Sequence, residues 1–119
     1  RLALEIGEGL SRHGTARVSL GGEEVEVAAY EVDGFGNKLL MDDTNVPSLL
    51  SLPYLGAMNA SSQLYRRTRS FVFGATNPFF FEGSAGRGVG GPHVGPGWIW
   101  PLSIIQFIHG STSDEEIMW

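Results

Sequence analysis

The chain has 119 residues, a length that fits one small domain, and it contains no cysteine, which excludes disulfides, thiolate zinc sites and cysteine nucleophiles. Its formal net charge is −5, with 13 acidic against 8 basic residues, which disfavours a nucleic-acid partner because phosphate binding needs clustered positive charge. The longest apolar run, residues 98–108, is broken by Pro101 and Gln106, so no membrane partner is expected, and the cellular compartment stays open.

The first quarter of the chain predicts one helix and one hairpin. Apolar residues at helical spacing among charged ones predict a helix over residues 2–13 that ends at Gly14, although no capping side chain precedes it. Apolar and polar residues then alternate over 17–20 and 25–27 on either side of Gly21 and Gly22, the pattern of a short hairpin.

The middle of the chain predicts a turn-rich stretch and two helices. Residues 30–37 carry two glycines in three positions and predict a turn-rich connection. A short helix is expected over 48–55, begun by Pro47. The strongest helical pattern covers 62–73, and Gly74 follows where a left-handed C-cap is expected.

The last third predicts a long loop between helical segments. An aromatic extended segment over 77–83 leads into a single glycine loop over 83–97, followed by a buried helix over 102–108. Ser113 and Glu116 have the spacing of a capping box, which announces a helix that runs only to Trp119. We therefore expect helices to carry the framework, with one hairpin, and we expect the chain to be an internal piece of a longer protein.

The glycine loop contains a literal G-x-G-x-x-G over residues 86–91. A dinucleotide site needs a strand before this motif, a helix directly after it and an acidic residue some 20 positions on. Here Pro92 and His93 follow, and that acidic residue is absent. The context therefore disfavours nucleotide binding.

His93 on this loop has two interpretations. It either hydrogen-bonds loop backbone or makes a polar contact to a ligand, since loop polar residues often carry function. The three histidines lack ligand-type spacing, and His13 and His109 stand at expected helix ends, where a cation suits the helix dipole. We therefore expect no metal site and no cofactor.

Asp42 and Asp43 stand side by side before Pro47. In one interpretation, one aspartate is a helix N-cap or a turn residue and the other is solvated. In the other, the pair binds sugar hydroxyls through charged hydrogen bonds. Adjacent positions seldom hold two carboxyls across a scissile bond at the roughly 6.5–9.5 Å that an inverting glycosidase needs. The alternating Glu31 and Asp33 are expected to satisfy local turns.

Several stretches together resemble glycoside hydrolase family 125. They occur in the family's order, as YEVDGFGN (30–37), MDDTNVPSLL (41–50), PYLG (53–56), NPFFFEG (77–83), GGPH (90–93), IWPLS (99–103) and SDEE (113–116). The first 28 residues match only as a helix plus hairpin.

The resemblance implies a metal-independent, inverting exo-α-1,6-mannosidase that acts on oligosaccharide or N-glycan mannosides; the family's fungal branch consists of meiotically up-regulated proteins. It implies an all-α fold, with residues 1–119 forming part of an (α/α)6 barrel with a small β-hairpin and long active-site loops. Asp42, Asp43 and Asn45 match the family's Asp-Asp-x-Asn motif, with Thr44 a mild departure at the variable position, and His93 matches its histidine after the glycine loop. The resemblance implies that these four residues bind substrate.

The resemblance places both catalytic carboxyls elsewhere. The family's acid belongs to an Arg-Pro-Ser-Asp-Asp motif, expected before Arg1, and its base to a His-Glu motif, expected beyond Trp119. Residues 1–119 are then expected to form a wall of the sugar pocket, with no catalytic residue and no activity alone. The alternatives are a non-catalytic carbohydrate-binding or helical interaction module and, less favoured, a nucleotide-binding domain.

Overall fold

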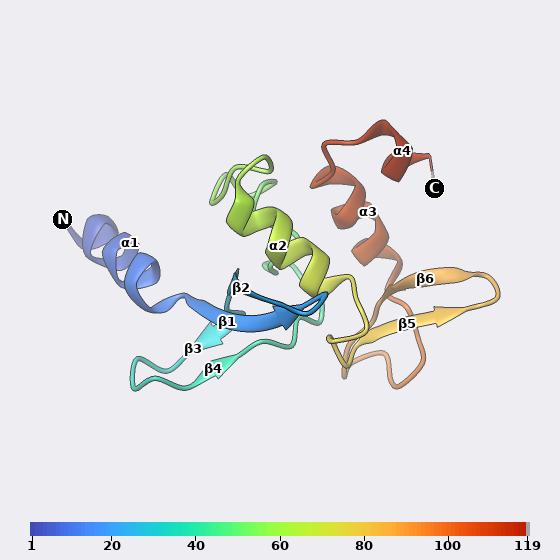
Figure 1. Ribbon diagram of the computed structural model, residues 1–119, viewed down its shortest axis with the longest axis horizontal. Helices are drawn as coiled ribbons and strands as arrows, with labels where there is room; N and C mark the ends of the chain where they lie inside the picture. Colours follow the sequence, from blue (N-terminus) through green and yellow to red (C-terminus); the bar gives the residue numbers. More distant parts are fainter. Residues whose placement is uncertain (119) are drawn as a thin grey trace.

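The fold combines helices with small antiparallel sheets, as a computed structural model that describes residues 1–118 shows (Figure 1). Each of the three sheets in this range has two strands. The elements are α1 (Leu2–His13), β1 (Thr15–Leu20), β2 (Glu23–Ala28), β3 (Glu31–Val32), β4 (Lys38–Leu39), α2 (Gln63–Val72), β5 (Phe80–Gly83), β6 (Gly86–Val89), α3 (Pro101–His109) and α4 (Asp114–Ile117).

The expected all-α architecture is wrong for this chain. About 30% of it is helix and about 20% is strand, so the fold is mixed α/β rather than part of an all-helical barrel. Two hairpins were missed. One pairs Glu31 with Leu39 across the predicted turn-rich connection. The other pairs Phe80 with Val89 and joins the predicted aromatic extended segment to the first part of the predicted glycine loop. Strands of two to four residues carry too few alternating positions to be recognised from pattern alone, and β5 and β6 also contain glycine.

The core forms where β2 packs against α2. The predicted hairpin is confirmed as β1–β2, with Val18 opposite Val25. Val27 of β2 and Val72 of α2 are both fully buried in one apolar cluster. A buried hydrogen bond joins the two elements, since the Ala28 amide donates to Thr68 Oγ1 at 2.8 Å.

Helix α2 begins as predicted but ends differently. The Ser62 hydroxyl accepts a hydrogen bond from the Tyr65 amide, as expected of an N-cap. The predicted left-handed C-cap at Gly74 is wrong, because Gly74 does not have a positive φ. Its glycine identity has another reason: a Cβ there would lie 2.9 Å from the Ser70 carbonyl oxygen.

The predicted helix over 48–55 is also wrong, because this stretch forms turns. The Ser51 hydroxyl donates to the Ser48 carbonyl at 2.8 Å and accepts from the Ser48 amide at 2.8 Å. Serine side chains that bond nearby backbone in this way compete with the helical pattern.

The predicted helix over 102–108 is confirmed as α3, which Pro101 begins. Its buried side chains are polar, however, namely Ser103 and Gln106, while Leu102, Ile104 and Ile105 are partly exposed. A helix expected to bury its apolar residues therefore turns a polar face inward.

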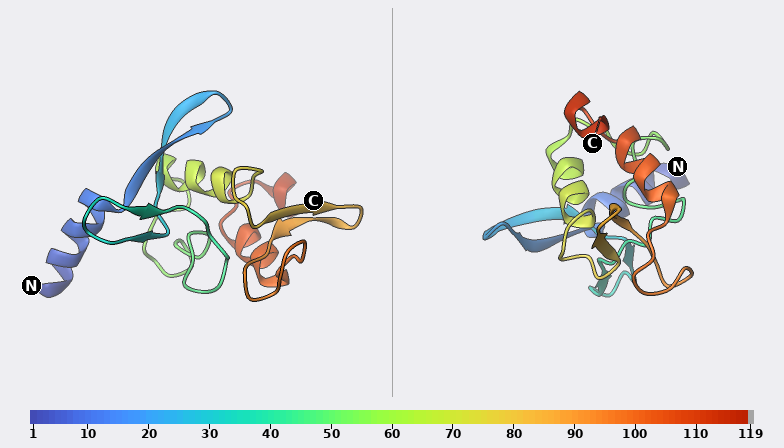
Figure 2. Two further views of the ribbon diagram at one scale, coloured as in Figure 1. Left: turned by 90° about the horizontal axis from the view of Figure 1, so that it is seen from below. Right: turned by 90° about the vertical axis from the view of Figure 1, so that its right-hand side faces the viewer.

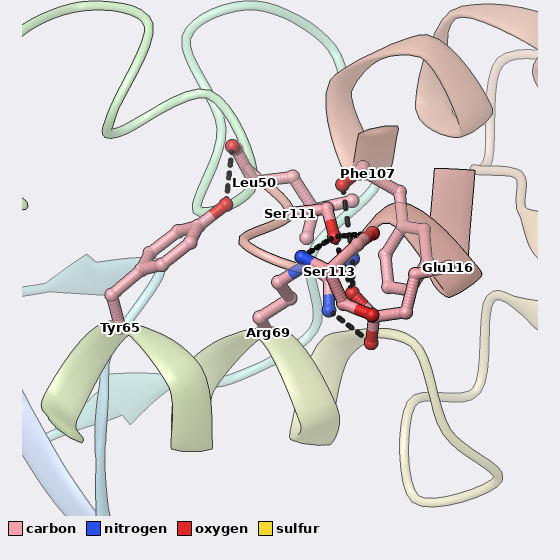
Figure 3. A network of polar contacts seen from close by, with 7 residues as sticks. All are labelled: Leu50, Tyr65, Arg69, Phe107, Ser111, Ser113 and Glu116. Atoms are coloured by element: carbon pink, nitrogen blue, oxygen red, sulfur yellow. Dashed lines mark hydrogen bonds and ion pairs between the residues drawn. The ribbon is translucent and has the colours of Figure 1, made fainter. Parts of the chain in front are cut away.

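Helix α4 is held by a polar cluster rather than by the predicted capping box (Figure 3). Ser113 is its N-cap but makes no side-chain cap bond. Glu116 instead accepts from Arg69 Nη1 at 3.0 Å and from the Ser111 hydroxyl at 2.6 Å. Trp119, to which the predicted helix extends, lies outside the described residues.

Arg69 joins three helices in this cluster. Its Nη2 donates to the Phe107 carbonyl at 3.1 Å, and its guanidinium lies 3.5 Å from the centroid of the Phe107 ring. Hydrogen bonds from Arg69 and Ser111 lower the pKa of Glu116. The cluster therefore connects α4 to α2 and α3 by a charged and an aromatic contact together.

Helix α1 matches its predicted range but buries none of its residues. It projects from the remainder of the chain at the N-terminal end (Figures 1 and 2), and Leu2, Leu4, Ile6 and Leu10 keep 53–73% of their surface exposed. Within residues 1–118, no helix combines the length and apolar character needed to cross a bilayer.

Candidate functional site

The candidate site is built around the loop that follows β4. Asp42 lies in its interior: the side chain is fully buried, and its carboxylate accepts from the Thr44 amide at 2.9 Å and from the Leu49 amide at 3.0 Å. Burial raises the pKa of Asp42 to about 6, although the backbone donors oppose that rise. In this structure Asp42 therefore bonds the loop's own backbone and presents no surface to a ligand.

Thr44 has a left-handed backbone, with φ of 57°, which is rare for a β-branched residue. Buried side chains hold it on both sides. Its amide donates to Asp42, and its carbonyl accepts from Gln106 Nε2 at 2.9 Å. The oxygen of the Gln106 side-chain amide, Oε1, accepts a hydrogen bond from the Ser48 hydroxyl at 2.7 Å. Helix α3 thus fixes the loop at two points.

Asn77 fixes the same loop to the end of α2. Its Nδ2 donates to the Asp42 carbonyl at 3.1 Å and to the Val72 carbonyl at 2.9 Å, and its Oδ1 accepts from the Phe79 amide at 3.1 Å. The side chain is buried, so these bonds have no competition from water. The loop conformation is therefore set from two directions, by α3 and by the segment after α2.

Asp43 has other partners than Asp42. Its Oδ1 accepts from the Tyr30 hydroxyl at 3.1 Å and from the Asn45 amide at 3.2 Å. Its Oδ2 accepts from Asn45 Nδ2 at 3.0 Å and lies 4.0 Å from His93 Nε2. Burial, together with the charge of Asp43, raises the pKa of Tyr30 to about 12, so the phenol remains a donor at neutral pH.

Glycines let the His93 segment approach Asp43. A Cβ on Gly91 would lie 2.8 Å from the Asp43 Cβ, and one on Gly90 would lie 2.0 Å from the Trp98 carbonyl oxygen. On β6, a Cβ at Gly88 would meet the Ile99 side chain at 2.5 Å. These glycines allow close packing. Because the G-x-G-x-x-G runs through a hairpin strand and into turns, it lacks the strand–loop–helix context of a dinucleotide site.

The fold brings the four residues predicted to bind substrate close together: Asp42, Asp43 and Asn45 on the loop after β4, and His93 beside Asp43. Their environments differ. Asp43, Asn45 and His93 meet at an open edge, where the side chain of Asp43 is 13% exposed and that of His93 is 77% exposed. Asp42 supports the loop from inside. A carboxylate oxygen beside an imidazole can bind a neutral hydroxyl group, since one accepts and the other donates or accepts.

Three residues that hold this cluster were not among the predicted site residues, namely Tyr30, Asn77 and Gln106. Tyr30 and Asn77 lie within the family-like stretches, and a glutamine in an otherwise apolar helix is a signal for a buried polar contact. Over residues 1–118 no group of three or more His, Cys, Asp and Glu side chains is placed to hold a metal ion.

Three comparisons point to one family. The family model described as "Metal-independent alpha-mannosidase (GH125)" matches residues 1–119. A curated relative, the Meiotically up-regulated gene 157 protein of Schizosaccharomyces pombe, is 44% identical over 117 residues. A solved Streptococcus pneumoniae structure, described as a metal-independent α-mannosidase in a non-productive complex with α-1,6-mannobiose, is 35% identical with a TM-score of 0.87.

The chain spans only part of these relatives. The matches cover 98% of this chain, but 22% of the fission yeast protein and 26% of the streptococcal chain.

Proposed function

This chain belongs to the GH125 family of metal-independent α-mannosidases, and we propose that the protein containing it releases terminal α-1,6-linked mannose from oligosaccharides or N-glycans. The observation that carries the proposal is the contact of Asp43 with His93, where carboxylate Oδ2 and imidazole Nε2 lie 4.0 Å apart and the two side chains are 13% and 77% exposed. The linkage is supported by the mannobiose in the related streptococcal structure.

The proposed contacts are Asp43, Asn45 and His93, with Asp42 acting through the loop backbone. A sugar hydroxyl that donates to Asp43 Oδ2 can accept from His93 Nε2 when that nitrogen carries a proton. The carboxylate is already held by Tyr30 and Asn45, so little ordering is needed when the sugar arrives.

The proposed mechanism is inverting and needs two further carboxyls. One must protonate the leaving oxygen while the other activates water on the opposite face, at a separation of roughly 6.5–9.5 Å. Asp42 cannot serve beside Asp43, because its carboxylate is buried and bonded to backbone. We therefore assign the acid and the base to parts of the protein outside residues 1–119, and we expect this segment alone to be inactive.

A second candidate is a carbohydrate-binding module without chemistry. It is favoured by the same observation, since the Asp43 cluster offers binding groups but no pair of accessible carboxyls. The two candidates differ in turnover, because a binding module holds the sugar without hydrolysing it.

The test is an assay of the full-length protein on mannobioses with α-1,2, α-1,3 and α-1,6 linkages, with an added chelator as control. We expect hydrolysis of the α-1,6 disaccharide with or without chelator, and β-mannose as the first product by proton NMR, which reports inversion. Binding without release of mannose would support the module instead. α-Mannose as first product would exclude the inverting mechanism.

A further inference from the structure

The two oxygens of the Asp43 carboxylate have different surroundings. Oδ1 accepts two hydrogen bonds, from the Tyr30 hydroxyl and the Asn45 amide. Oδ2 accepts one, from Asn45 Nδ2, and faces His93. A carboxylate oxygen can accept two donors, so Oδ2 is the atom left for a ligand hydroxyl.

Tyr30 is itself firmly placed. Its amide donates to the Leu39 carbonyl at 2.8 Å, which fixes its backbone beside β3 and β4, and its ring packs against the core cluster. Its hydroxyl is the group that reaches Asp43, from 13 residues earlier in the chain. Tyr30 therefore connects the core cluster to the Asp43 side chain.

We propose that Tyr30 is a positioning residue that holds Asp43 Oδ1 and so turns Oδ2 toward His93 and the substrate. This inference rests on the proposed function. Without the hydroxyl, Oδ1 keeps only the Asn45 amide at 3.2 Å, and the carboxylate can rotate about its Cβ–Cγ bond. Both remaining hydrogen bonds to the carboxylate then come from Asn45, which is itself only half-buried.

The first test is Tyr30→Phe in the full-length protein, which keeps the ring and removes only the hydroxyl. We expect kcat/KM on α-1,6-mannobiose to fall by about 10- to 100-fold, the effect of one hydrogen bond to a charged group. The matched control is Tyr54→Phe, because the Tyr54 side chain lies on a largely exposed turn, and it should retain wild-type kinetics.

A double-mutant cycle separates positioning from general loss of structure. Mannose affinity is measured by calorimetry for Tyr30→Phe, Asp43→Ala and the double variant. We expect Tyr30→Phe to weaken binding in the wild-type background and to change it less than 2-fold once Asp43 is removed, because a residue that acts through Asp43 has nothing left to position. A merely structural role would cost the same in both backgrounds and would overturn the proposal.

The outcomes also separate this inference from the proposed function. If the wild-type protein neither hydrolyses nor binds a mannoside, the proposed function fails and the Tyr30 role fails with it. If the wild-type protein is active and Tyr30→Phe has unchanged kcat/KM, only the role of Tyr30 is overturned. Should Asp43→Ala not fold, the cycle is run with mannosides deoxygenated in turn at C2, C3, C4 and C6, and the Tyr30 effect is expected to disappear with one of them; an equal Tyr30 effect on all four would overturn the proposal.

Discussion

At the scale of single residues, the two neighbouring carboxylates of Asp42 and Asp43 have different roles. Asp42 is buried and bonded to the backbone of its own loop, whereas Asp43 is partly exposed and held by side chains of Tyr30 and Asn45. One aspartate of the pair shapes the loop, and the other is available to a ligand.

The burial of Asp42 predicts a pH dependence of stability. Its pKa rises from 3.8 to about 6 in the folded chain, so between these values the folded state binds more protons than the unfolded state. The free energy of unfolding then falls as pH rises through this range, by about 3 kcal/mol from Asp42 alone. Asp42→Asn removes the titrating group, and the stability of wild type relative to this variant should fall from pH 4 to pH 7 in urea titrations.

Asp33 provides a control, because its contribution to stability should change with pH in the opposite direction. Hydrogen bonds from Asn37 and Phe35 lower its pKa, so its contribution to stability is present above its ordinary pKa and is lost in acid. Wild type should therefore gain stability relative to Asp33→Asn as pH rises. A wild type that also gains stability relative to Asp42→Asn over pH 4–7 would contradict the account of Asp42.

At the scale of elements, α3 holds the site loop through Gln106. Gln106→Glu replaces the donor to the Thr44 carbonyl by an acceptor and adds a buried charge. We expect a loss of about 2 kcal/mol or more in the free energy of unfolding, because a buried carbonyl is left unpaired. Urea denaturation of the full-length protein measures it.

Gln63→Glu is the matched control for this change. Gln63 is exposed in the first turn of α2, where a negative charge suits the helix dipole, so stability should be unchanged or slightly higher. Equal effects of the two substitutions would show that Gln106 does not fix the loop.

In the cluster that joins α2, α3 and α4, lysine should stabilise the fold less than arginine at position 69. Arg69→Lys cannot keep both bonds to Glu116 and the contact of the guanidinium with the Phe107 ring, so we expect a loss of about 1–3 kcal/mol in the free energy of unfolding. Arg66→Lys, on the exposed side of the same helix, should change stability by less than about 0.5 kcal/mol. Thermal denaturation compares them.

This cluster also has a defined pH dependence. The pKa of Glu116 is lowered, so the stabilisation is present at neutral pH and is lost as pH falls below the ordinary value of 4.5. The difference in free energy of unfolding between wild type and Arg69→Lys should therefore become smaller in acid. A difference that grows in acid would show that the charge contact between Arg69 and Glu116 is not its cause.

At the scale of the whole molecule, α1 leaves apolar side chains exposed. We expect residues 1–119, produced alone, to self-associate through Leu2, Ile6 and Leu10, which recur every four residues on one face of α1, because exposed apolar patches mark contact surfaces. The double variant Ile6→Glu and Leu10→Glu should be more monomeric by analytical ultracentrifugation, while Glu8→Lys, on the opposite face of the same helix, should not. A wild-type segment that stays monomeric at high concentration would contradict this.

Local signals predicted part of this fold, and long-range contacts explain the rest. Helices α1 and α2 and the first hairpin follow from periodicity and a Gly-Gly turn. The sequence does not show that Arg69 would take Glu116 from its capping box, because the two residues are 47 positions apart. The hairpin of β5 and β6 depends on Gly88 fitting against Ile99, which no local pattern shows.

The candidate site was predicted by resemblance and refined by geometry. The resemblance singled out Asp42, Asp43, Asn45 and His93, but residue type alone does not distinguish a buried aspartate from an exposed one. Tyr30 and Gln106 were missed as partners because their contacts to the loop cross 13 and 62 residues. Side chains that act through other side chains leave little trace in a single sequence.

The most direct test of the account is a crystal structure of the full-length protein with α-1,6-mannobiose. We predict one mannose hydroxyl within hydrogen-bonding distance of both Asp43 Oδ2 and His93 Nε2, with the Tyr30 hydroxyl still bonded to Asp43 Oδ1 and Asp42 still buried. A mannose bound elsewhere, with Asp43 and His93 free of contact, would contradict the assignment of this loop cluster as the sugar-binding wall.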